Sequence, residues 1–381
     1  MKNDSDPGFS SVDHALMARA LRLAERGLGT TQPNPRVGCV IAHGDGVAGE
    51  GWHQRAGEPH AEVFALRAAG DRARGATVYT TLEPCTHHGR TPPCADALID
   101  AGIARIVVAS RDPNPKVAGM GLERLREAGI TVASGLMRDA ARELNRGFFS
   151  RFERGRPWVR VKLATSLDGR TALANGESKW ITGEAARADV QRWRARSSAI
   201  LTGAGTARAD DPRLTVRLPG MTHPLPNPPL EGEGFKPLRV VLDARLDALR
   251  ADAHLLDGGA PTLVLHAPDA TRRDDCYARA ELAAVPADPD GRLDLDAVLR
   301  LLAARGVNEL QVEAGPALCG ALFERGLVDE LLLYVAPTLL GDSARPLLAL
   351  PPLEGMASRR NLRVVGERRV GADWRLLLRP D

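Results

Sequence analysis

The 381-residue sequence has few aromatic residues, few cysteines, almost no net charge and no long apolar run. Aromatic residues make up 4% of the chain, so few side chains are available to stack on the bases of a single-stranded nucleic acid. Lys and Arg number 51 against 48 Asp and Glu, a formal charge of +3, and the chain is close to neutral on both sides of Ser150. Nucleic-acid-binding proteins usually carry a basic patch. We therefore expect no nucleic-acid partner.

The cysteine content and the hydropathy pattern bear on the cellular compartment. The five cysteines are Cys39, Cys85, Cys94, Cys276 and Cys319. This small, odd number is not typical of a secreted protein held together by disulfides. No stretch approaches the ~18 consecutive apolar residues of a membrane helix, and residues 1–11 lack the apolar core of a secretion signal. We expect a cytoplasmic protein with reduced thiols and no membrane partner.

The length of the chain predicts two domains, at about 150 residues per domain. Hydrophobic residues make up 44% and charged residues 26%, as in ordinary globular proteins. Apolar runs of strand length alternate with helical patterns in both halves, which predicts α/β domains built on covered, largely parallel sheets. A polar stretch at 151–156 precedes Pro157, so we expect one domain over residues 1–150 and another over 151–381. The Pro- and Gly-rich stretch Leu218–Pro237 predicts an exposed loop.

Four residues of the first half form a pattern typical of a catalytic zinc site. His60 begins a helical segment, and Cys85 and Cys94 lie on either side of a loop that leads into another helix. One imidazole and two thiolates give Zn²⁺ three protein ligands, which leaves its fourth position for water. Glu62, two residues beyond His60, is close to the metal and can carry a proton from water to a leaving amine. The simpler alternative is a surface histidine with buried thiols.

The order of these residues is the signature of zinc-dependent nucleobase deaminases, His-x-Glu, then Pro-Cys, then Cys. Deaminases of nucleosides and nucleic acids separate the two cysteines by two residues, whereas eight separate Cys85 from Cys94. The long spacer resembles the deaminase of riboflavin biosynthesis. This resemblance implies a cytidine-deaminase-like three-layer α/β/α domain.

The same resemblance implies further substrate contacts in the first half. Asn34 and His53 match positions that contact the pyrimidine, and His87 and Arg90 match contacts to the substrate and its phosphate. Considered alone, Asn34 between two prolines is a turn former. Considered alone, His53 is a polar strand end. These two residues therefore depend on the resemblance for their assignment.

The second half is similar to the NADPH-dependent, dihydrofolate-reductase-like domain of the same pathway. The resemblance lies in residues 161–170, 176–182, 201–217 and 313–322. Within the last segment, Gly315-Pro316 follows a strand and begins a helix, where free amide groups suit a pyrophosphate. Residues 203–208 lack the third glycine of a Rossmann fingerprint. Both halves together resemble the bifunctional deaminase/reductase family of riboflavin biosynthesis over nearly the whole chain.

The reductase resemblance implies two sets of contacts. The NADPH set is Ala164, Trp180, Thr206, Asp210, Ala244, Gly315, Pro316, Ala317, Leu318, Cys319, Gly320 and Ala321. The substrate set is Ser178, Arg194, Leu214, Arg217 and Glu313. Two arginines suit a ribose phosphate, which favours bidentate cationic donors. Without the resemblance, Arg194 would be a solvated helix residue and Trp180 a core or interface aromatic.

These resemblances imply a bifunctional enzyme that uses Zn²⁺ and NADPH. The first reaction is hydrolytic deamination of 2,5-diamino-6-(5-phosphoribosylamino)pyrimidin-4-one. The second reduces the ribosyl to a ribityl chain, giving 5-amino-6-(5-phosphoribitylamino)uracil, and the family implies a homodimer through the reductase domain. One alternative is a zinc deaminase of a nucleoside or RNA base with a non-catalytic C-terminal domain. Another is a non-enzymatic zinc protein with a closed four-ligand site completed by His87 or His88.

Overall fold

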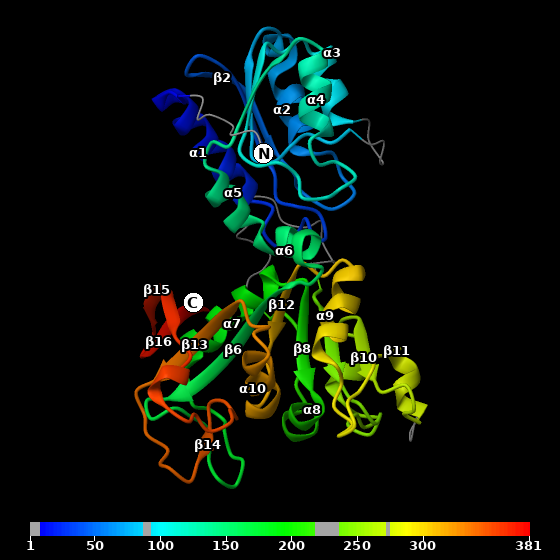
Figure 1. Cartoon of the computed structure of the whole chain (residues 1–381), viewed down its shortest axis with the longest axis vertical. Helices are drawn as coiled ribbons and strands as arrows, with labels where there is room; N and C mark the ends of the chain where they lie inside the picture. The colour runs from blue at the N-terminus through cyan, green and yellow to red at the C-terminus, as the bar shows by residue number, and fades with distance from the viewer. Residues whose placement is uncertain (1–7, 87–92, 218–235, 272–274) are drawn as a thin grey trace. The chain divides into compact units, whose positions relative to one another are not determined.

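The computed structural model describes residues 8–86, 93–217, 236–271 and 275–381 (Figure 1). The described residues form two compact units, which divide between Arg154 and Gly155. The expected boundary at residue 150 therefore falls inside helix α6 (Arg146–Arg154). Most of the Pro- and Gly-rich stretch, residues 218–235, lies outside the described residues. Within the described parts, no helix combines the length and apolar character needed to cross a membrane.

The first unit is a three-layer α/β/α domain around a five-stranded sheet in the order β2-β1-β3-β4-β5. The strands are β1 (Gly38–His43), β2 (Gly46–Trp52), β3 (Thr77–Thr80), β4 (Arg105–Val108) and β5 (Thr131–Ser134). The helices are α1 (Ser11–Glu25), α2 (Ala61–Ala69), η1 (Gly70–Ala73), α3 (Cys94–Asp100), α4 (Met120–Glu127), α5 (Arg138–Leu144) and α6. Alternate residues of β1 point to opposite faces of the sheet. Cys39 and Ile41 pack with α2, α3 and α4 on one face, and Val40 and Ala42 pack with α1 and α5 on the other.

The β2 strand has no strand-type apolar run in its sequence, because it is rich in glycine. Strand-type patterns are rich in branched and aromatic residues, whereas β2 carries Gly46, Gly49 and Gly51. A Cβ on Gly49 would lie 2.4 Å from the carbonyl oxygen of Ala65, and one on Gly51 2.6 Å from that of Ala61. The backbone of α2 therefore lies directly on β2. Because β1 pairs antiparallel with both β2 and β3, this sheet is mixed rather than largely parallel.

The second unit contains a nine-stranded sheet in the order β11-β10-β9-β8-β12-β6-β13-β16-β15. Its strands are β6 (Trp158–Ser166), β8 (Ala199–Gly203), β9 (Leu238–Leu242), β10 (Thr262–His266), β11 (Glu281–Ala284), β12 (Glu309–Val312), β13 (Glu330–Ala336), β15 (Leu362–Val370) and β16 (Asp373–Pro380). The strands from β11 to β13 are parallel. The sequence predicts a closing hairpin at 362–366 and 374–378, and the antiparallel pair β15–β16 confirms it.

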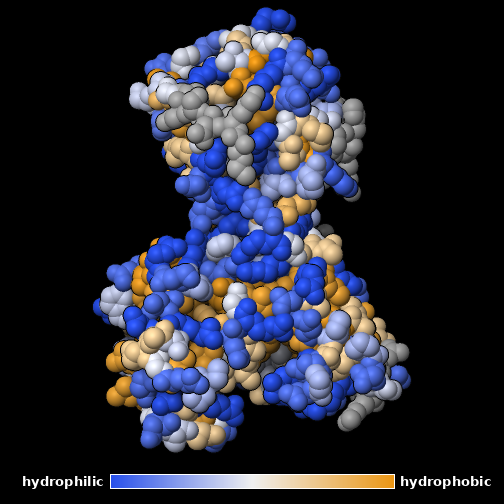
Figure 2. Space-filling model, viewed as in Figure 1, coloured by the Kyte–Doolittle hydropathy of each residue, from blue (hydrophilic) through white to orange (hydrophobic). Residues whose placement is uncertain are grey.

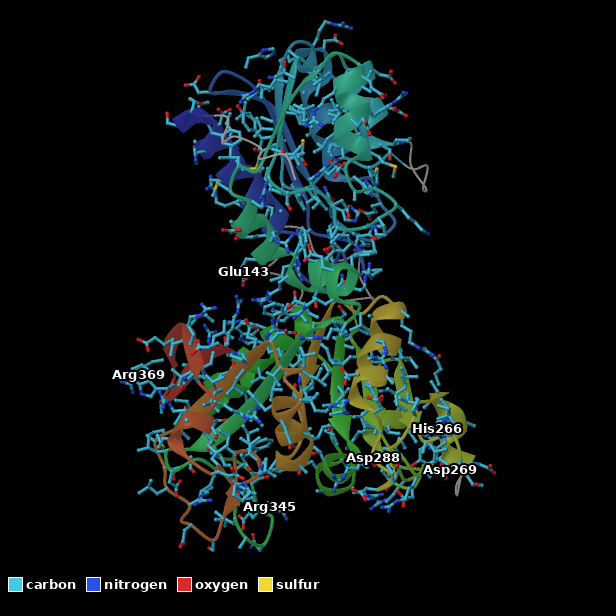
Figure 3. All side chains as sticks on the ribbon, viewed as in Figure 1. Glu143, His266, Asp269, Asp288, Arg345 and Arg369 are labelled. Atoms are coloured by element: carbon cyan, nitrogen blue, oxygen red, sulfur yellow. The ribbon has the colours of Figure 1, made fainter. Side chains whose placement is uncertain are left out.

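Helices cover both faces of the large sheet. They are α7 (Glu184–Arg196), α8 (Ala204–Asp210), η2 (His254–Leu256), η3 (Asp275–Arg279), α9 (Leu295–Ala304), α10 (Pro316–Glu324) and η4 (Met356–Ser358). The apolar residues of α9 and α10 pack on one face, and those of α7 pack on β13 at the other. A two-stranded sheet, β7 (Arg170–Ala172) with β14 (Arg345–Pro346), adds a small flap, where Figure 3 labels Arg345.

A buried ionic group joins the amino ends of three central strands. The Arg160 guanidinium of β6 lies 2.7 Å from a Glu330 carboxylate oxygen of β13 and 3.0 Å from one of Glu309 in β12. The three side chains are almost completely buried. Opposite charges that are buried need each other as partners. The group therefore helps to fix the register of β12, β6 and β13. The carboxyl ends of β6 and β12 contribute to the larger of the two cavities described next.

Candidate active sites

Three ligand-type side chains meet at one point of the first unit. His60 is the N-cap residue of α2, Cys94 begins α3, and Cys85 lies in the segment between β3 and α3. The His60 Nδ1 atom lies 3.5 Å from the Cys85 Sγ and 3.3 Å from the Cys94 Sγ. The three ligand atoms all lie within 4.8 Å of one another. The fold therefore brings together the three residues that the sequence predicts as metal ligands.

The geometry and the chemistry of this cluster fit Zn²⁺. Ligand atoms at about 2.0 and 2.3 Å from a tetrahedral zinc lie roughly 3.5 Å from each other, close to the observed separations. Hydrogen bonding from Cys94 and His60 lowers the pKa of the Cys85 thiol, which favours the thiolate, the form that binds metal. One imidazole and two sulfurs leave a fourth zinc position open to water.

The Glu62 side chain lies beside this cluster with one oxygen available. It is buried on the first turn of α2, and its Oε1 accepts a hydrogen bond from the Thr80 hydroxyl at 3.5 Å. Its Oε2 has no hydrogen-bond partner among the described residues. Burial raises the pKa of this carboxyl group. A buried carboxylate with a free oxygen near a zinc site is suited to accept and return a proton.

The cluster opens into a cavity of about 590 Å³, which also contains Asn34 and His53. The His53 Nδ1–H donates to the Pro59 carbonyl at 3.0 Å, and its Nε2 accepts from the Asn34 amide at 3.1 Å. Burial lowers the pKa of His53 to about 4, so the ring is neutral. The two side chains thus hold each other in fixed orientations on the cavity wall.

Some residues of this cavity escaped the sequence analysis, and two predicted ones lie outside the described residues. The unforeseen lining residues include Asp112, Asn114, Phe148, Arg151 and Phe152. Asp112 and Asn114 follow β4, and polar residues just beyond a buried parallel strand are a signal that could have found them. The other three lie on α6, far away in the sequence. The predicted contacts at residues 87 and 90 fall in the undescribed segment 87–92.

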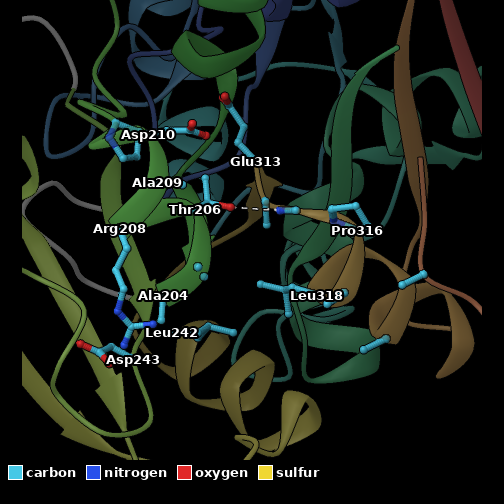
Figure 4. A pocket seen from close by; sticks show the side chains of 18 of the residues that line it. Ala204, Thr206, Arg208, Ala209, Asp210, Leu242, Asp243, Glu313, Pro316 and Leu318 are labelled. Atoms are coloured by element: carbon cyan, nitrogen blue, oxygen red, sulfur yellow. Dashed lines mark hydrogen bonds between the residues drawn. The ribbon is translucent and has the colours of Figure 1, made fainter. Parts of the chain in front are cut away.

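A second cavity of about 1230 Å³ lies in the second unit at the carboxyl ends of β6, β8, β9 and β12 (Figure 4). The sequence-predicted residues that line it are Ala164, Ser178, Arg194, Thr206, Asp210, Leu214, Ala244, Glu313, Gly315, Pro316, Ala317, Leu318 and Ala321. The Gly315 N–H, at the start of α10, donates to the Thr206 hydroxyl at 3.1 Å, as the dashed line in Figure 4 shows. This places the amino end of α10 next to α8 in the cavity wall.

Arg194 is bound to Glu313 in this cavity. Its Nε and Nη2 atoms lie 2.7 and 2.8 Å from the two carboxylate oxygens, and Nη1 donates to the Thr215 carbonyl. Although burial raises it, the Arg194 guanidinium lowers the pKa of Glu313 to about 2. The sequence also indicates Lys162, near the end of a strand, as a contact to the sugar or cofactor without a defined role. Lys162 lines this cavity, and its buried ammonium faces Glu313.

Four predicted contacts of the second unit are not in the lining of this cavity. The Trp180 residue is 70% exposed, and the Arg187 guanidinium lies 4.6 Å from the centre of its ring. Arg217 lies beyond the lining and donates to the Thr215 hydroxyl. Cys319 and Gly320 lie on the buried side of α10, where a Cβ on Gly320 would lie 2.0 Å from the Ala349 carbonyl oxygen. Helical periodicity turns these two residues away from the cavity that their neighbours line.

Comparison with known proteins gives a family for each part of the chain and for the whole. The cytidine and deoxycytidylate deaminase zinc-binding region matches residues 10–110, and the RibD C-terminal domain matches residues 157–376. The chain is 50% identical over 365 residues to the riboflavin biosynthesis protein RibD of Escherichia coli, covering 95% of this chain and 97% of that one. The chain belongs to the RibD family. Members of this family are bifunctional deaminases and reductases of riboflavin biosynthesis.

Solved structures of RibD proteins have the same fold. Acinetobacter baumannii RibD is 44% identical, with a TM-score of 0.86 over 97% of this chain and 99% of that one. A Thermotoga maritima protein described as a diaminohydroxyphosphoribosylaminopyrimidine deaminase/5-amino-6-(5-phosphoribosylamino)uracil reductase is 31% identical, with a TM-score of 0.83 over the same shares. This RibD-family chain therefore combines a zinc-dependent, cytidine-deaminase-like domain with an NADPH-dependent, dihydrofolate-reductase-like domain. The RibD C-terminal match disfavours the alternative in which the second half is non-catalytic.

Proposed function

We propose that the first unit deaminates 2,5-diamino-6-(5-phosphoribosylamino)pyrimidin-4-one and that the second unit reduces the product to 5-amino-6-(5-phosphoribitylamino)uracil. The observation that carries this proposal is the pairing of the zinc-type cluster and Glu62 in one unit with a large cavity at the strand ends of the other. The substrates follow from the two activities named for the Thermotoga maritima relative. We assign the deaminase to the unit that ends at Arg154 and the reductase to the unit that begins at Gly155, a few residues beyond the boundary at residue 150 that the sequence predicts.

In the deaminase, His60, Cys85 and Cys94 would hold Zn²⁺. Bound zinc acidifies water and so supplies the nucleophile for hydrolysis. The ring carbon gains a C–O bond and loses its C–N bond, and ammonia leaves with one extra proton. Glu62 takes the proton from water on Oε2 and returns it to the leaving amine. Asn34 and the neutral His53 bind the pyrimidine edge, and we assign His87 and Arg90 to the sugar phosphate.

In the reductase, residues of the second cavity would hold NADPH and the sugar. NADPH bound there would supply the hydride for reduction at C1′ of the ribosyl group, with the C1′–O4′ bond broken and O4′ protonated. The free amides at the start of α10 suit the pyrophosphate. Arg194 and Glu313 form a rigid pair that positions the substrate. Ser178, Leu214 and Arg217 complete the proposed substrate set, and Ala164, Trp180 and Asp210 belong to the proposed cofactor set.

We also propose a homodimer through the reductase unit, a cytoplasmic location and no nucleic-acid partner. Hydrophilic and hydrophobic residues are interspersed on the face in Figure 2, and the formal charge of +3 is small for this length. Val364 and Trp374 are exposed apolar side chains on the hairpin β15–β16 at the edge of the large sheet. Such an edge favours pairing with a second copy. Light scattering on the purified chain tests this, because a monomeric mass contradicts the dimer.

The test of the proposed function is incubation of the purified chain with the diaminopyrimidine phosphoriboside, with and without NADPH. We expect ammonia release in both cases and NADPH oxidation only after deamination has begun. Ammonia and NADPH are measured separately. Absence of ammonia release contradicts the deaminase assignment, and absence of NADPH oxidation after ammonia release contradicts the reductase assignment.

A further inference from the structure

The cavity of the first unit has an uneven distribution of charge. Its described lining includes four carboxylates, those of Glu58, Glu62, Glu83 and Asp112. Among the described lining residues, the single Lys or Arg is Arg151. The proposed substrate carries a phosphate, which such an acidic wall would repel. A phosphate that enters this cavity therefore needs a cation close by.

Two of these carboxylates have structural partners. Glu83 accepts backbone N–H donors from Asp112, Gly119 and Gly121, so it holds the loop that follows β4 in place. Glu58 lies 3.9 Å from the Arg55 guanidinium. Neither of them forms an ion pair with Arg151.

The Arg151 guanidinium is half-buried and stacked on aromatic rings. It lies 4.6 Å from the centre of the Phe152 ring and 5.6 Å from that of Phe148. Stacking uses the face of the guanidinium and leaves its N–H edge free for a planar or tetrahedral anion. Two other arginines of α6 bind polar side chains instead, Arg146 to Glu143 and Arg154 to Ser150.

Among the described residues, no hydrogen bond or ion pair involves the Arg151 side chain. Burial lowers the pKa of this guanidinium, while the more distant Asp112 carboxylate opposes that change. Partial burial of an unpaired cation is unfavourable unless a ligand supplies the missing anion. The rings of Phe148 and Phe152 keep the guanidinium in the cavity wall although its burial without an anion is unfavourable.

We infer that Arg151 binds the phosphate of the deaminase substrate. This inference rests on the proposed function. The pyrimidine ring is uncharged, so the phosphate is the group of the substrate that a guanidinium recognises by charge. The substrate is then held at two ends, with its ring against Asn34 and His53 and its phosphate on Arg151. Arg151, in addition to the proposed contacts of His87 and Arg90, would thereby make this deaminase specific for phosphorylated substrates over free ribosides.

The experiment compares two substrates, the diaminopyrimidine phosphoriboside and its dephosphorylated riboside, in the full-length zinc-loaded chain without NADPH. We expect Arg151→Met to raise the KM for the phosphorylated compound by roughly 10- to 100-fold, the usual effect of losing a charged hydrogen bond. The kcat/KM for the riboside should stay the same. Arg151→Lys should restore part of the loss, because the charge remains and the bidentate geometry is lost.

A matched control is Arg67→Met, since Arg67 also lies over a phenylalanine, 5.9 Å from the centre of Phe64, but does not line the cavity. It should leave the kinetic values for both substrates unchanged. Zinc content and the thermal unfolding midpoint of every variant are measured in parallel. The inference is overturned if Arg151→Met lowers kcat/KM equally for both substrates. It is also overturned if the preference for the phosphorylated substrate is lost on substitution of Arg90 but kept in Arg151→Met.

A direct binding measurement separates this inference from the proposed function. If the wild-type chain releases no ammonia from either compound, the proposed function fails. Calorimetric titration with ribose 5-phosphate in saturating NADP⁺ then decides the role of Arg151. If Arg151→Met binds one equivalent of ribose 5-phosphate fewer than the wild type, the inference is supported. If both proteins bind the same number of equivalents, the inference is overturned.

Discussion

At the scale of single residues, the two cavities differ in how their buried carboxylates are paired. Both oxygens of Glu313 are bound by Arg194, whereas the Oε2 of Glu62 has no hydrogen-bond partner among the described residues. A carboxylate in a bidentate pair stays ionised and holds its neighbours in place. An unpaired buried carboxylate can exchange a proton with a ligand. Glu62 is therefore suited to proton transfer and Glu313 to positioning.

The role of Glu62 predicts the effect of its amide variant. Glu62→Gln keeps the shape and the Thr80 contact but cannot take up a proton, so we expect ammonia release to fall by about 10²- to 10⁴-fold. Zinc content, measured by elemental analysis, should stay at the wild-type level because Glu62 is not needed as a ligand. Ammonia release at the wild-type rate would contradict this role.

The pairing of Glu313 predicts a pH dependence of stability. Its folded pKa of about 2 lies below the ordinary value of 4.5, so ionised Glu313 stabilises the fold above pH 4.5. This contribution is lost as the pH falls from about 4.5 towards about 2. The difference in unfolding free energy between wild type and Glu313→Gln should shrink over that range, as measured by urea unfolding.

The exposed Glu367 provides a control for this measurement. The Glu367→Gln variant should differ little from the wild type in unfolding free energy at every pH. A Glu313→Gln difference that stays constant between neutral pH and pH 2 would show that the ion pair with Arg194 does not control the titration of Glu313.

At the scale of elements, the position of α2 determines the geometry of the deaminase site. The helix begins directly after His60, carries Glu62 in its first turn, and lies on the glycine backbone of β2. The close approach at Gly51 is to the Ala61 carbonyl, at the beginning of the helix. A strand without side chains at these points thus brings a metal ligand and a proton-transfer group to the cavity.

This contact predicts that Gly51→Ala damages both stability and the metal site. The added methyl would lie 2.6 Å from the Ala61 carbonyl oxygen, so the start of α2 must shift. We expect a loss of about 1–3 kcal/mol in unfolding free energy, the usual cost of overpacking, together with weaker zinc retention against a chelator. Gly205→Ala is the control, because a Cβ there meets nothing within 4 Å. Equal zinc retention in the two variants would contradict the prediction.

At the scale of the whole molecule, the two cavities are lined by different units. Every described lining residue of the smaller cavity lies before Arg154, and every one of the larger cavity lies after Gly155. Each unit has its own sheet and its own hydrophobic clusters. Loss of one site therefore need not disturb the other.

Removal of zinc tests this independence. Cys85→Ser, or dialysis against a chelator, should abolish ammonia release and lower the zinc content, because one of the three ligands is lost or the metal itself is removed. NADPH oxidation with the deaminated intermediate supplied directly should continue at the wild-type rate. Parallel loss of both activities would show that the reductase depends on the metal site.

The metal-type cluster, the two α/β units and the family can all be recognised from the order of the amino acids. His60, Glu62, Cys85 and Cys94 are recognisable because a metal site needs particular side-chain chemistries at the ends of local elements. The segment Gly315–Leu318 is recognisable because a glycine and a proline at a helix start have a local cause. In both cases the residue types and their positions at the ends of local elements are enough to indicate the feature.

The set of distant residues that line one cavity wall follows from the packing of the folded chain. Arg151 joins the deaminase cavity because α6 packs beside it, and no local pattern indicates that contact. Cys319 and Gly320 point away from the cavity because of the rotation of α10, although they belong to the same motif as Leu318. Spacing along the chain specifies local geometry, whereas burial, pairing and cavity walls depend on packing between elements that are far apart in sequence.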